Sequence, residues 1–261
     1  MWPSTYSAVS LDALLRRELI APASLAGHMR VVYEEIVEME TGAVKGHEAL
    51  TRIRTDASES VDPQAWFAAA RSLGSPAKIE ARAAHLALSD LPPGKGLLAI
   101  NFSPDCLATP EVQGTLDRLA DLDRTVVVEL AEHHHVTPRT LDRSLGGIRD
   151  RGLLVAVDDV GMGESGPEFV RQVHPDIIKV DNTHTDELHK SRAQQDFLLS
   201  YIQMAHSENA ILIAEGVETP QVAVGLRRLA RTWDVPIYGQ GYWLSELWQP
   251  DGVFASAQEA I

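Results

Sequence analysis

The sequence predicts an α/β protein whose main domain is a TIM-like (β/α)8 barrel with an antiparallel first strand. Short apolar runs that suit buried strands alternate with longer stretches that suit helices, which is typical of repeated βα units around a parallel sheet. The connection between the first two runs is too short for a crossover helix and predicts an antiparallel hairpin. A chain of 261 residues suits one barrel or two smaller domains, and no linker or repeat indicates a second domain.

Eight runs of the sequence are short, apolar and rich in β-branched residues, as expected of strands. The predicted strands cover residues 29–37, 43–50, 97–102, 125–130, 153–158, 176–180, 210–214 and 236–238. Residues 40–42, which read Glu-Thr-Gly, form the short connection between the first two. The first strand is therefore antiparallel to the second, and the remaining strands are parallel to the second.

The stretches between these runs predict the helices that cover the barrel. They span residues 61–73, 78–91, 109–120, 138–151, 167–173, 191–208 and 220–232. Several begin with an oxygen-bearing side chain followed by proline, such as Thr137 with Pro138 and Thr219 with Pro220. The first residue suits a helix N-cap and the proline suits the first turn, so these starts are well marked.

The N-terminal residues 1–27 contain the amphipathic segment LDALLRREL. We expect this part to be a helical extension that packs on the barrel, while residues 28–261 form the barrel domain.

Composition excludes several functional classes. The formal net charge of −14 argues against DNA binding, which needs clustered Lys and Arg. Cys106 is the only cysteine, which allows no internal disulfide and suits a reducing compartment. We find neither a signal segment nor an apolar run of the roughly 20 residues that span a bilayer. These features predict a cytoplasmic protein without a membrane anchor.

Polar side chains stand at or near the ends of the predicted strands. They are Glu48, Asn101, Glu129, Asp158, Asp159, Lys179, Asp181, Glu215 and Gln240. In barrels of this kind the C-terminal strand ends meet on one face, so these groups are expected to converge. Any one of the acidic residues alone would be weak evidence, because a single carboxylate after a strand is usually a helix cap or a solvated loop residue. Together, so many carboxylates repel each other unless divalent cations neutralise them, and hard oxygen ligands favour Mg²⁺ or Mn²⁺. The pattern predicts a two-metal site.

Seven ordered motifs carry a family resemblance. They are GHEALTR, NFSP, VELAE, VAVDDVGMG, PDIIKVD, IAEGVET and QGYW. In order and approximate spacing they resemble the EAL domain, a bacterial family of cyclic di-GMP phosphodiesterases, over roughly residues 28–250. The resemblance implies an EAL-type barrel that uses two Mg²⁺ or Mn²⁺ ions to hydrolyse cyclic di-GMP to linear pGpG, and relatives of this kind often form homodimers.

The resemblance also implies roles for individual residues. Glu48, Asn101, Glu129 and Asp158 are the implied ligands of one metal, with Asp158 shared, and Asp159 and Glu215 serve the second. Lys179 contacts the attacking water, Asp181 orients Lys179, and Gln240 helps to hold the metal and water cluster. Leu50 and Arg52 lie in the segment that contacts substrate, and Glu132 anchors the loop after the fifth predicted strand, residues 153–158. For Glu132 an equal alternative is a carboxylate interacting with a helix dipole.

The chain departs from the family pattern around the implied metal shell. Glu34 and Glu35 stand where the family usually has Gln-Pro, and that glutamine normally contacts the dinucleotide. The segment DDVGMGESG replaces DDFGTGYSS, with substitutions at Val160, Met162, Glu164 and Gly166. His47 replaces the usual aromatic residue before the metal-binding glutamate.

These departures leave alternatives open. One alternative to an active phosphodiesterase is a catalytically weak domain that acts as a receptor for cyclic di-GMP or as a protein-interaction module. Another is a hydrolase of a different phosphodiester. His133, His134 and His135 form a further metal candidate, but consecutive side chains rarely aim at one ion, and an exposed loop is the favoured interpretation.

Overall fold

The computed structural model describes residues 11, 13–16, 28–54, 60–89, 91–131, 136–161, 166–185, 191–233 and 235–247. Within these residues the strands are β1 (Met29–Glu38), β2 (Val44–Arg54), β3 (Ser60–Val61), β4 (Leu97–Phe102), β5 (Val126–Ala131), β6 (Leu154–Val160), β7 (Ile177–Val180), β8 (Ile211–Ala214) and β9 (Ile237–Gly239). They form one sheet in the order β1-β9-β8-β7-β6-β5-β4-β2-β3, and β1 also pairs with β2. That extra pairing closes eight strands into a barrel, so the predicted fold is confirmed.

The strand directions also match the prediction. β1 is antiparallel to both of its neighbours, β2 and β9. The other barrel strands are parallel to one another. Their C-terminal ends therefore meet on one face, which we call the mouth of the barrel.

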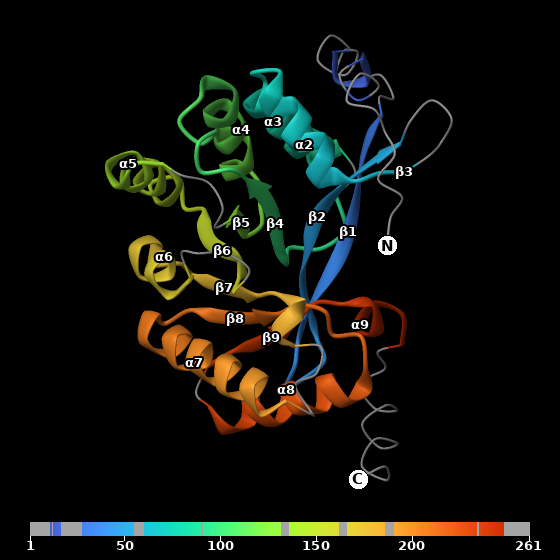
Figure 1. The fold of residues 1–261 in the computed structure, drawn as a ribbon, viewed down its shortest axis with the longest axis vertical. Coiled ribbons are helices and arrows are strands. Elements are labelled where there is room, and N and C mark those ends of the chain that lie inside the picture. The colour runs from blue at the N-terminus through green and yellow to red at the C-terminus, as the bar shows by residue number, and fades with distance from the viewer. Residues whose placement is uncertain are drawn as a thin grey trace.

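The helices surround the outside of the sheet (Figure 1). They are α2 (Pro63–Ser72), α3 (Pro76–Ser89), α4 (Pro110–Ala120), α5 (Pro138–Arg149), α6 (Gly166–Val173), α7 (Arg192–Glu208), α8 (Pro220–Thr232) and the short α9 (Tyr242–Leu247), with a 3₁₀ turn η1 (Asn182–His184) after β7. The expected N-caps are present, since the Thr137 side chain accepts from the Thr140 N–H and that of Thr219 from the Val222 N–H. No helix in the described part of the chain is both long and apolar enough to cross a membrane.

Two apolar layers hold the barrel together. One large cluster lies between the sheet and the surrounding helices and includes Val128 and Val155. A separate cluster fills the inside of the barrel and consists of Ile36, Ala99, Val127, Ala156, Ile177 and Ile213. Because successive strand residues point to opposite faces, every second residue of each strand faces this interior.

The β1–β2 hairpin is longer than the barrel is deep. The sequence predicts that the second strand ends at Leu50, but β2 continues to Arg54 and stays paired with β1 as far as Met29. This projecting ribbon packs against α2 and α3, as Figure 1 also shows. A third apolar cluster lies there and contains Ile53, Trp66 and, from the N-terminal segment, Leu15. The description of residues 1–27 as a packed helical extension stays a prediction.

Candidate metal centre

The polar residues at the mouth form the layer directly above the apolar interior. Ala99, Val127, Ala156, Ile177 and Ile213 of the interior cluster are each followed, two positions later, by Asn101, Glu129, Asp158, Lys179 and Glu215. A spacing of two keeps a side chain on the same face of its strand. The alternation that builds the core therefore also directs these polar groups inward, and the parallel register brings them to one level.

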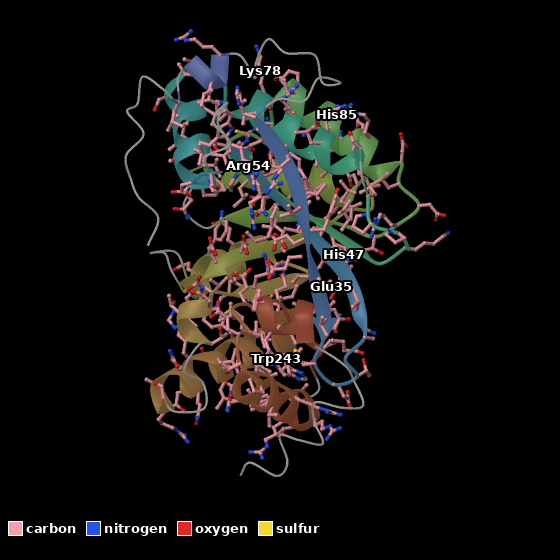
Figure 2. The ribbon with its side chains drawn as sticks, turned by 90° about the vertical axis from the view of Figure 1, so that its right-hand side faces the viewer. Glu35, His47, Arg54, Lys78, His85 and Trp243 are labelled. Carbon is pink, nitrogen blue, oxygen red and sulfur yellow. The ribbon has the colours of Figure 1, made fainter. Side chains whose placement is uncertain are left out.

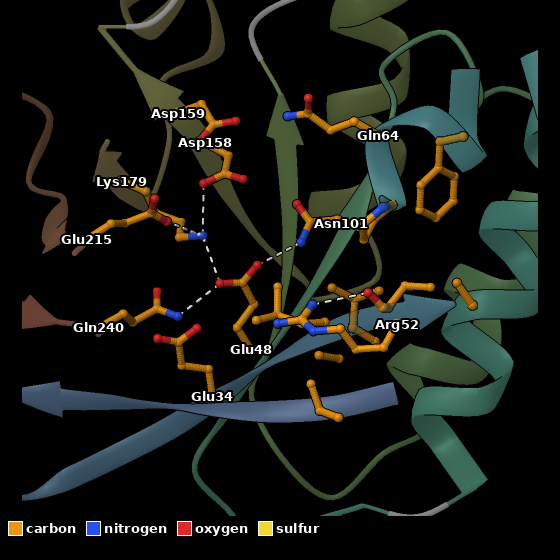
Figure 3. A pocket seen from close by; sticks show the side chains of 18 of the residues that line it. Glu34, Glu48, Arg52, Gln64, Asn101, Asp158, Asp159, Lys179, Glu215 and Gln240 are labelled. Carbon is orange, nitrogen blue, oxygen red and sulfur yellow. Dashed lines mark hydrogen bonds and ion pairs between the residues drawn. The ribbon is translucent and has the colours of Figure 1, made fainter. Parts of the chain in front are cut away.

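Lys179 is the centre of this layer. It is 1% exposed, and its Nζ lies 2.8 Å from Asp158 Oδ1, 2.8 Å from Glu215 Oε1, 3.0 Å from Glu48 Oε2 and 3.1 Å from Glu129 Oε2. One ammonium group thus contacts carboxylates from four different parts of the barrel. Figure 3 shows the contacts with Asp158, Glu215 and Glu48. A single positive charge cannot neutralise all four, so the layer keeps an excess of negative charge.

The carboxylates fall into two overlapping sets, in each of which one oxygen per residue lies within 4.8 Å of the others. We call Glu48, Glu129 and Asp158 the inner group, because all three are buried. We call Asp158, Asp159 and Glu215 the outer group, because the last two are partly exposed. Asp158 belongs to both groups, as a ligand shared by two ions would.

Two amide side chains orient Glu48. Asn101 Nδ2 donates to Glu48 Oε1 at 2.8 Å, and Gln240 Nε2 donates to Glu48 Oε2 at 2.9 Å. Gln240 is buried, whereas Asn101 is exposed at the edge of the mouth. Because each amide nitrogen donates to Glu48, the oxygen of each amide can serve as a neutral metal ligand.

Burial and charge shift the pKa values of these groups in opposite directions. Burial opposes ionisation of Glu48, but the charge of Lys179 and the hydrogen bond from Gln240 outweigh it and lower the pKa of Glu48 to about 2. Burial, helped by repulsion from neighbouring carboxylates, raises the pKa of Glu129 well above its usual range and that of Glu215 to about 8. Without a cation, the layer therefore favours protons on some of its carboxylates.

Burial alone would lower the pKa of Lys179. The surrounding carboxylates, with Asp158 the strongest, more than reverse this and raise the pKa of Lys179 well above its usual value. The lysine is therefore charged at any physiological pH, and it provides a fixed positive charge beside the two groups.

The donor set fits hard divalent cations. Glu129 Oε1 and Gln240 Oε1 are buried and have no hydrogen-bond partner among the described residues. Buried oxygens normally have such a partner, and a bound cation supplies the missing interaction. All donors are carboxylate or amide oxygens, the ligand type that Mg²⁺ and Mn²⁺ prefer. The residues present therefore fit these ions.

The metal layer forms one end of a cavity of about 1350 Å³. The cavity runs from the mouth along the inner face of the projecting ribbon, past Leu50 and Arg52, to α2 and α3, where Phe67 and Arg71 line it. It is larger than the roughly 300–1,000 Å³ of an ordinary small-molecule pocket. The site therefore has room for a ligand with several rings next to the carboxylates.

Glu34 also lines this cavity, where the resemblance places the family glutamine that it replaces. It lies two positions before the interior residue Ile36 and is paired across the ribbon with Glu48. Burial, followed by repulsion from Glu48, raises the pKa of Glu34. Its neighbour Glu35 points to the other face of the ribbon, where it is paired with His47 (Figure 2). Only the first of the two substituted glutamates therefore reaches the site.

Some predicted contacts are not found, and others fall outside the described residues. Asp181 Oδ1 accepts hydrogen bonds from the Thr183 N–H at 2.9 Å and from the Thr183 hydroxyl at 2.6 Å. Asp181 thus caps the turn after β7, and the contacts of Lys179 are with carboxylates of other strands. The predicted contact by which Asp181 orients Lys179 is absent from both sets. Glu132 and residues 133–135 lie outside the described residues, as do residues 162–165 of the loop after β6.

A family model described as the EAL domain matches residues 17–246. Among curated proteins, the probable cyclic di-GMP phosphodiesterase PdeG of Escherichia coli K12 is 25% identical over 216 residues, which are 78% of this chain and 42% of PdeG. PdeN of the same organism, described in the same words, is 26% identical over 82% of this chain and 42% of its own length. The chain thus spans about two-fifths of these relatives.

Solved structures show the same architecture. An EAL domain protein from Listeria monocytogenes has a TM-score of 0.73 at 21% identity, covering 99% of this chain and 100% of that one, a likeness that shows the fold. BlrP1 of Klebsiella pneumoniae, in a complex with manganese and cyclic di-GMP, has a TM-score of 0.68 at 27% identity, covering 85% of this chain and 56% of that one.

Proposed function

The chain belongs to the EAL domain family, and from this premise we propose that it is a metal-dependent cyclic di-GMP phosphodiesterase with linear pGpG as its product. The observation that carries the proposal is the pair of carboxylate groups joined by Asp158 at the floor of a cavity of about 1350 Å³. Two relatives described as probable enzymes of this activity, and a manganese-bound and dinucleotide-bound neighbour, support the same substrate and cofactor.

The inner and outer groups would each hold one Mg²⁺ or Mn²⁺ ion. Glu48, Glu129 and Asp158, with Asn101 at their edge, would hold the first, and Asp158, Asp159 and Glu215 the second. When bound, a cation pair activates water, binds a phosphate oxygen and stabilises the leaving alkoxide. The exact ligand set and the number of ions are part of the proposal.

The chain's own residues would complete the reaction. Hydrolysis forms a bond from a water oxygen to phosphorus and breaks one phosphodiester P–O bond, with the water's proton passing to the leaving oxygen. Lys179 keeps its positive charge within about 3 Å of four carboxylates, a position from which it favours hydroxide over water and stabilises charge on phosphate. Gln240 and Asn101 keep Glu48 in one orientation through its two oxygens.

The ribbon and α2 would bind the rest of the substrate. Leu50 and Arg52 lie on the same face of β2 as Glu48, two and four residues further along the strand. Arg52 donates from Nη1 to the Thr51 carbonyl at 3.1 Å, which leaves most of its guanidinium donors for a ligand. Its positive charge suits a phosphate or the edge of a guanine base.

Formation of a homodimer is a further part of the proposal, which analytical ultracentrifugation tests.

The direct experiment incubates the purified chain with cyclic di-GMP, with and without Mn²⁺, and separates the products by chromatography. We expect pGpG only with the metal, and none from Glu48→Gln, which keeps the size of the side chain but removes the ionised ligand. If the wild type binds both the metal and the dinucleotide without forming pGpG, the enzymatic proposal is wrong.

One observation favours a second candidate function, a receptor for cyclic di-GMP. The Glu34 carboxyl lies opposite Glu48 at the cavity, and a second acid beside the phosphate position would displace a bound dinucleotide from the geometry that hydrolysis needs. Calorimetry in the presence of Ca²⁺, which occupies oxygen sites, measures dinucleotide binding separately from turnover. Tight binding together with no turnover in Mn²⁺ would identify the receptor.

A further inference from the structure

The backbone that carries the outer group is irregular. Asp159 has φ 53°, a left-handed conformation that few residues other than glycine adopt. The pairing between β6 and β7 also shifts register between Val157 and Val160. Glu215, the other member specific to this group, lies one residue beyond the end of β8, where its N–H still donates to the Val180 carbonyl at 3.0 Å and the next residue, Gly216, has φ 65°. Such backbone persists only where neighbouring structure holds it.

The neighbour in question is the turn after β7, residues 181–185, which we call the β7 turn. It contains η1, and Asp181 caps it by accepting the hydrogen bonds from Thr183. Gln194 of α7 fixes it from outside, because its Nε2 donates to the Thr183 carbonyl at 2.9 Å. The turn lies between the chain that follows Asp159 and the chain that follows β8.

His184 holds the first of these two chains. Its Nε2 lies 3.3 Å from the Gly161 carbonyl oxygen, which can only accept, so the imidazole donates there. The His184 ring is stacked on Phe197 with a centroid distance of 3.7 Å and an interplanar angle of 13°. A Cβ at Gly161 would lie 2.6 Å from the His184 ring and 2.7 Å from Phe197. The two stacked rings therefore form a surface against which the backbone two residues after Asp159 is pressed.

Thr185 and Asn182 hold the second chain. Thr185 is fully buried, and its hydroxyl donates to the backbone carbonyl of Glu215. Gly216 has φ 65° and packs so closely on Asn182 that any side chain at Gly216 would collide with it. One short turn thus contacts the backbone on both sides of the outer group.

The geometry points to the β7 turn as the element that positions the outer group. His184 and Thr185 act as positioning residues: they fix the backbones of Asp159 and Glu215 and thereby set the affinity of this group for its cation without binding the cation themselves. The inner group gains most of its order from the β2 and β5 ladders, so it depends far less on the turn. This inference rests on the proposed function only in taking a divalent cation as the ligand.

The test is a Mn²⁺ titration of the full chain, with binding followed by calorimetry and by the electron paramagnetic resonance signal of free Mn²⁺. The wild type is expected to bind two ions. Thr185→Val keeps the shape of the side chain but removes the hydroxyl. We expect the affinity for one ion to fall about tenfold, as is common when a group that orients metal ligands is removed. The affinity for the other ion is expected to change less than about twofold. Thr185→Ser, which keeps the hydroxyl, is expected to restore most of the loss.

Thr115→Val is the matched control. Thr115 is also fully buried, and its hydroxyl donates to the Glu111 carbonyl at 2.9 Å, but inside α4. Thermal unfolding of the metal-free proteins is expected to show similar losses for Thr115→Val and Thr185→Val, with weaker metal binding only in the second. A loss of stability alone then does not explain the result.

His184 provides an independent second variant. His184→Phe keeps the stacking on Phe197 but removes the donor to Gly161, and we expect a loss of about threefold for the same ion, against about tenfold for His184→Ala. Equal weakening of both ions, no weakening of either, or the same effect in Thr115→Val would overturn the inference, as would a wild type that binds fewer than two ions. A wild type that binds two ions without making pGpG would instead refute only the proposed function.

Discussion

The inner and outer groups share Asp158 but are built in different ways. The inner group stands on regular strands, where Asn101 pairs with Glu129 in register and Glu48 pairs with Ala99. The outer group stands where the β6 ladder has shifted register, on a residue with φ 53° and on one beyond the end of β8. A site on a ladder is formed by the fold itself, whereas a site on irregular backbone depends on local contacts.

The inner group is also more deeply buried than the outer group. All three inner carboxylates are buried, and Asp159 and Glu215 are partly exposed toward the cavity. The inner cation is therefore expected to be held more tightly and exchanged more slowly, while the outer one is open to water and substrate. If the proposed two ions bind, this contrast predicts a mainly structural role for the inner ion and a substrate-facing role for the outer one. The following changes test that prediction.

Replacing the shared ligand is expected to have the largest effect. Asp158→Asn removes a negative charge from both groups at once, and we expect pGpG formation to fall by roughly 10³-fold and both ions to bind more weakly. Initial rates and the Mn²⁺ titration measure the two effects. Asp176→Asn is the control, because Asp176 accepts a hydrogen bond from the Val155 N–H at the opposite end of β6. If Asp158→Asn weakens only one ion, the two groups do not share this residue.

Removing the positive charge of Lys179 is expected to have the second largest effect. Lys179→Met leaves four carboxylates around an apolar side chain, and we expect the metal-free protein to lose roughly 3–5 kcal/mol of unfolding free energy, as when one partner of a buried pair is removed. Protonation of the acids recovers part of this loss. Mn²⁺ is expected to raise the melting temperature more in the variant than in the wild type. An equal rise in both would show that Lys179 does not balance the charge of the metal-free site.

A change next to the outer group is expected to separate it from the inner group. Gly161→Ala places a methyl group against the His184 and Phe197 rings, at a residue with φ 104°. We expect about tenfold weaker binding of the outer ion, with the inner ion unaffected. Gly114→Ala is the matched control, because a Cβ there meets nothing within 4 Å, and it is expected to stabilise α4 by roughly 0.5–1 kcal/mol. Loss of both ions in Gly161→Ala would remove the contrast between the groups.

The smallest expected effect concerns substrate. Glu34→Gln removes a negative charge beside the inner group, and we expect the affinity for cyclic di-GMP to rise by roughly three- to tenfold, or about 1 kcal/mol. Calorimetry in Ca²⁺ measures this affinity. Glu35→Gln on the outward face of the same strand is the control and is expected to leave it unchanged. An equal gain from both variants would show that only net charge matters.

Much of the fold was predictable because its signals are local and repeated. Alternating strand-like and helix-like runs indicate the barrel, and the short connection before Val44 indicates the antiparallel first strand. Convergence of the polar residues was predictable as well, since Glu129, Asp158 and Lys179 follow buried runs that end on one face. The two-residue strand β3 and the short helix α9 were missed because segments of this length carry almost no periodic signal.

The remaining features depend on contacts between distant parts of the chain. The resemblance implied a substrate-side position for Glu34, but its pairing with Glu48 follows from the register of the ribbon, which the sequence of β1 alone does not determine. The cap that Asp181 forms on the β7 turn is a local contact, with the N–H and hydroxyl of Thr183. The orientation of Lys179 by Asp181 stays a prediction. The stacking of His184 on Phe197 was not predictable from the sequence, because Phe197 reaches the β7 turn only through the packing of α7 in the folded protein.

The most direct test of the central claim, that Asp158 joins two cation sites at the mouth of the barrel, is electron paramagnetic resonance of the Mn²⁺-loaded protein. Two Mn²⁺ ions that share a carboxylate lie about 3.5–4 Å apart and are magnetically coupled. The account predicts a coupled signal in the wild type at full loading and its loss in Asp158→Asn. A wild-type spectrum that contains only isolated Mn²⁺ ions at full loading would contradict it.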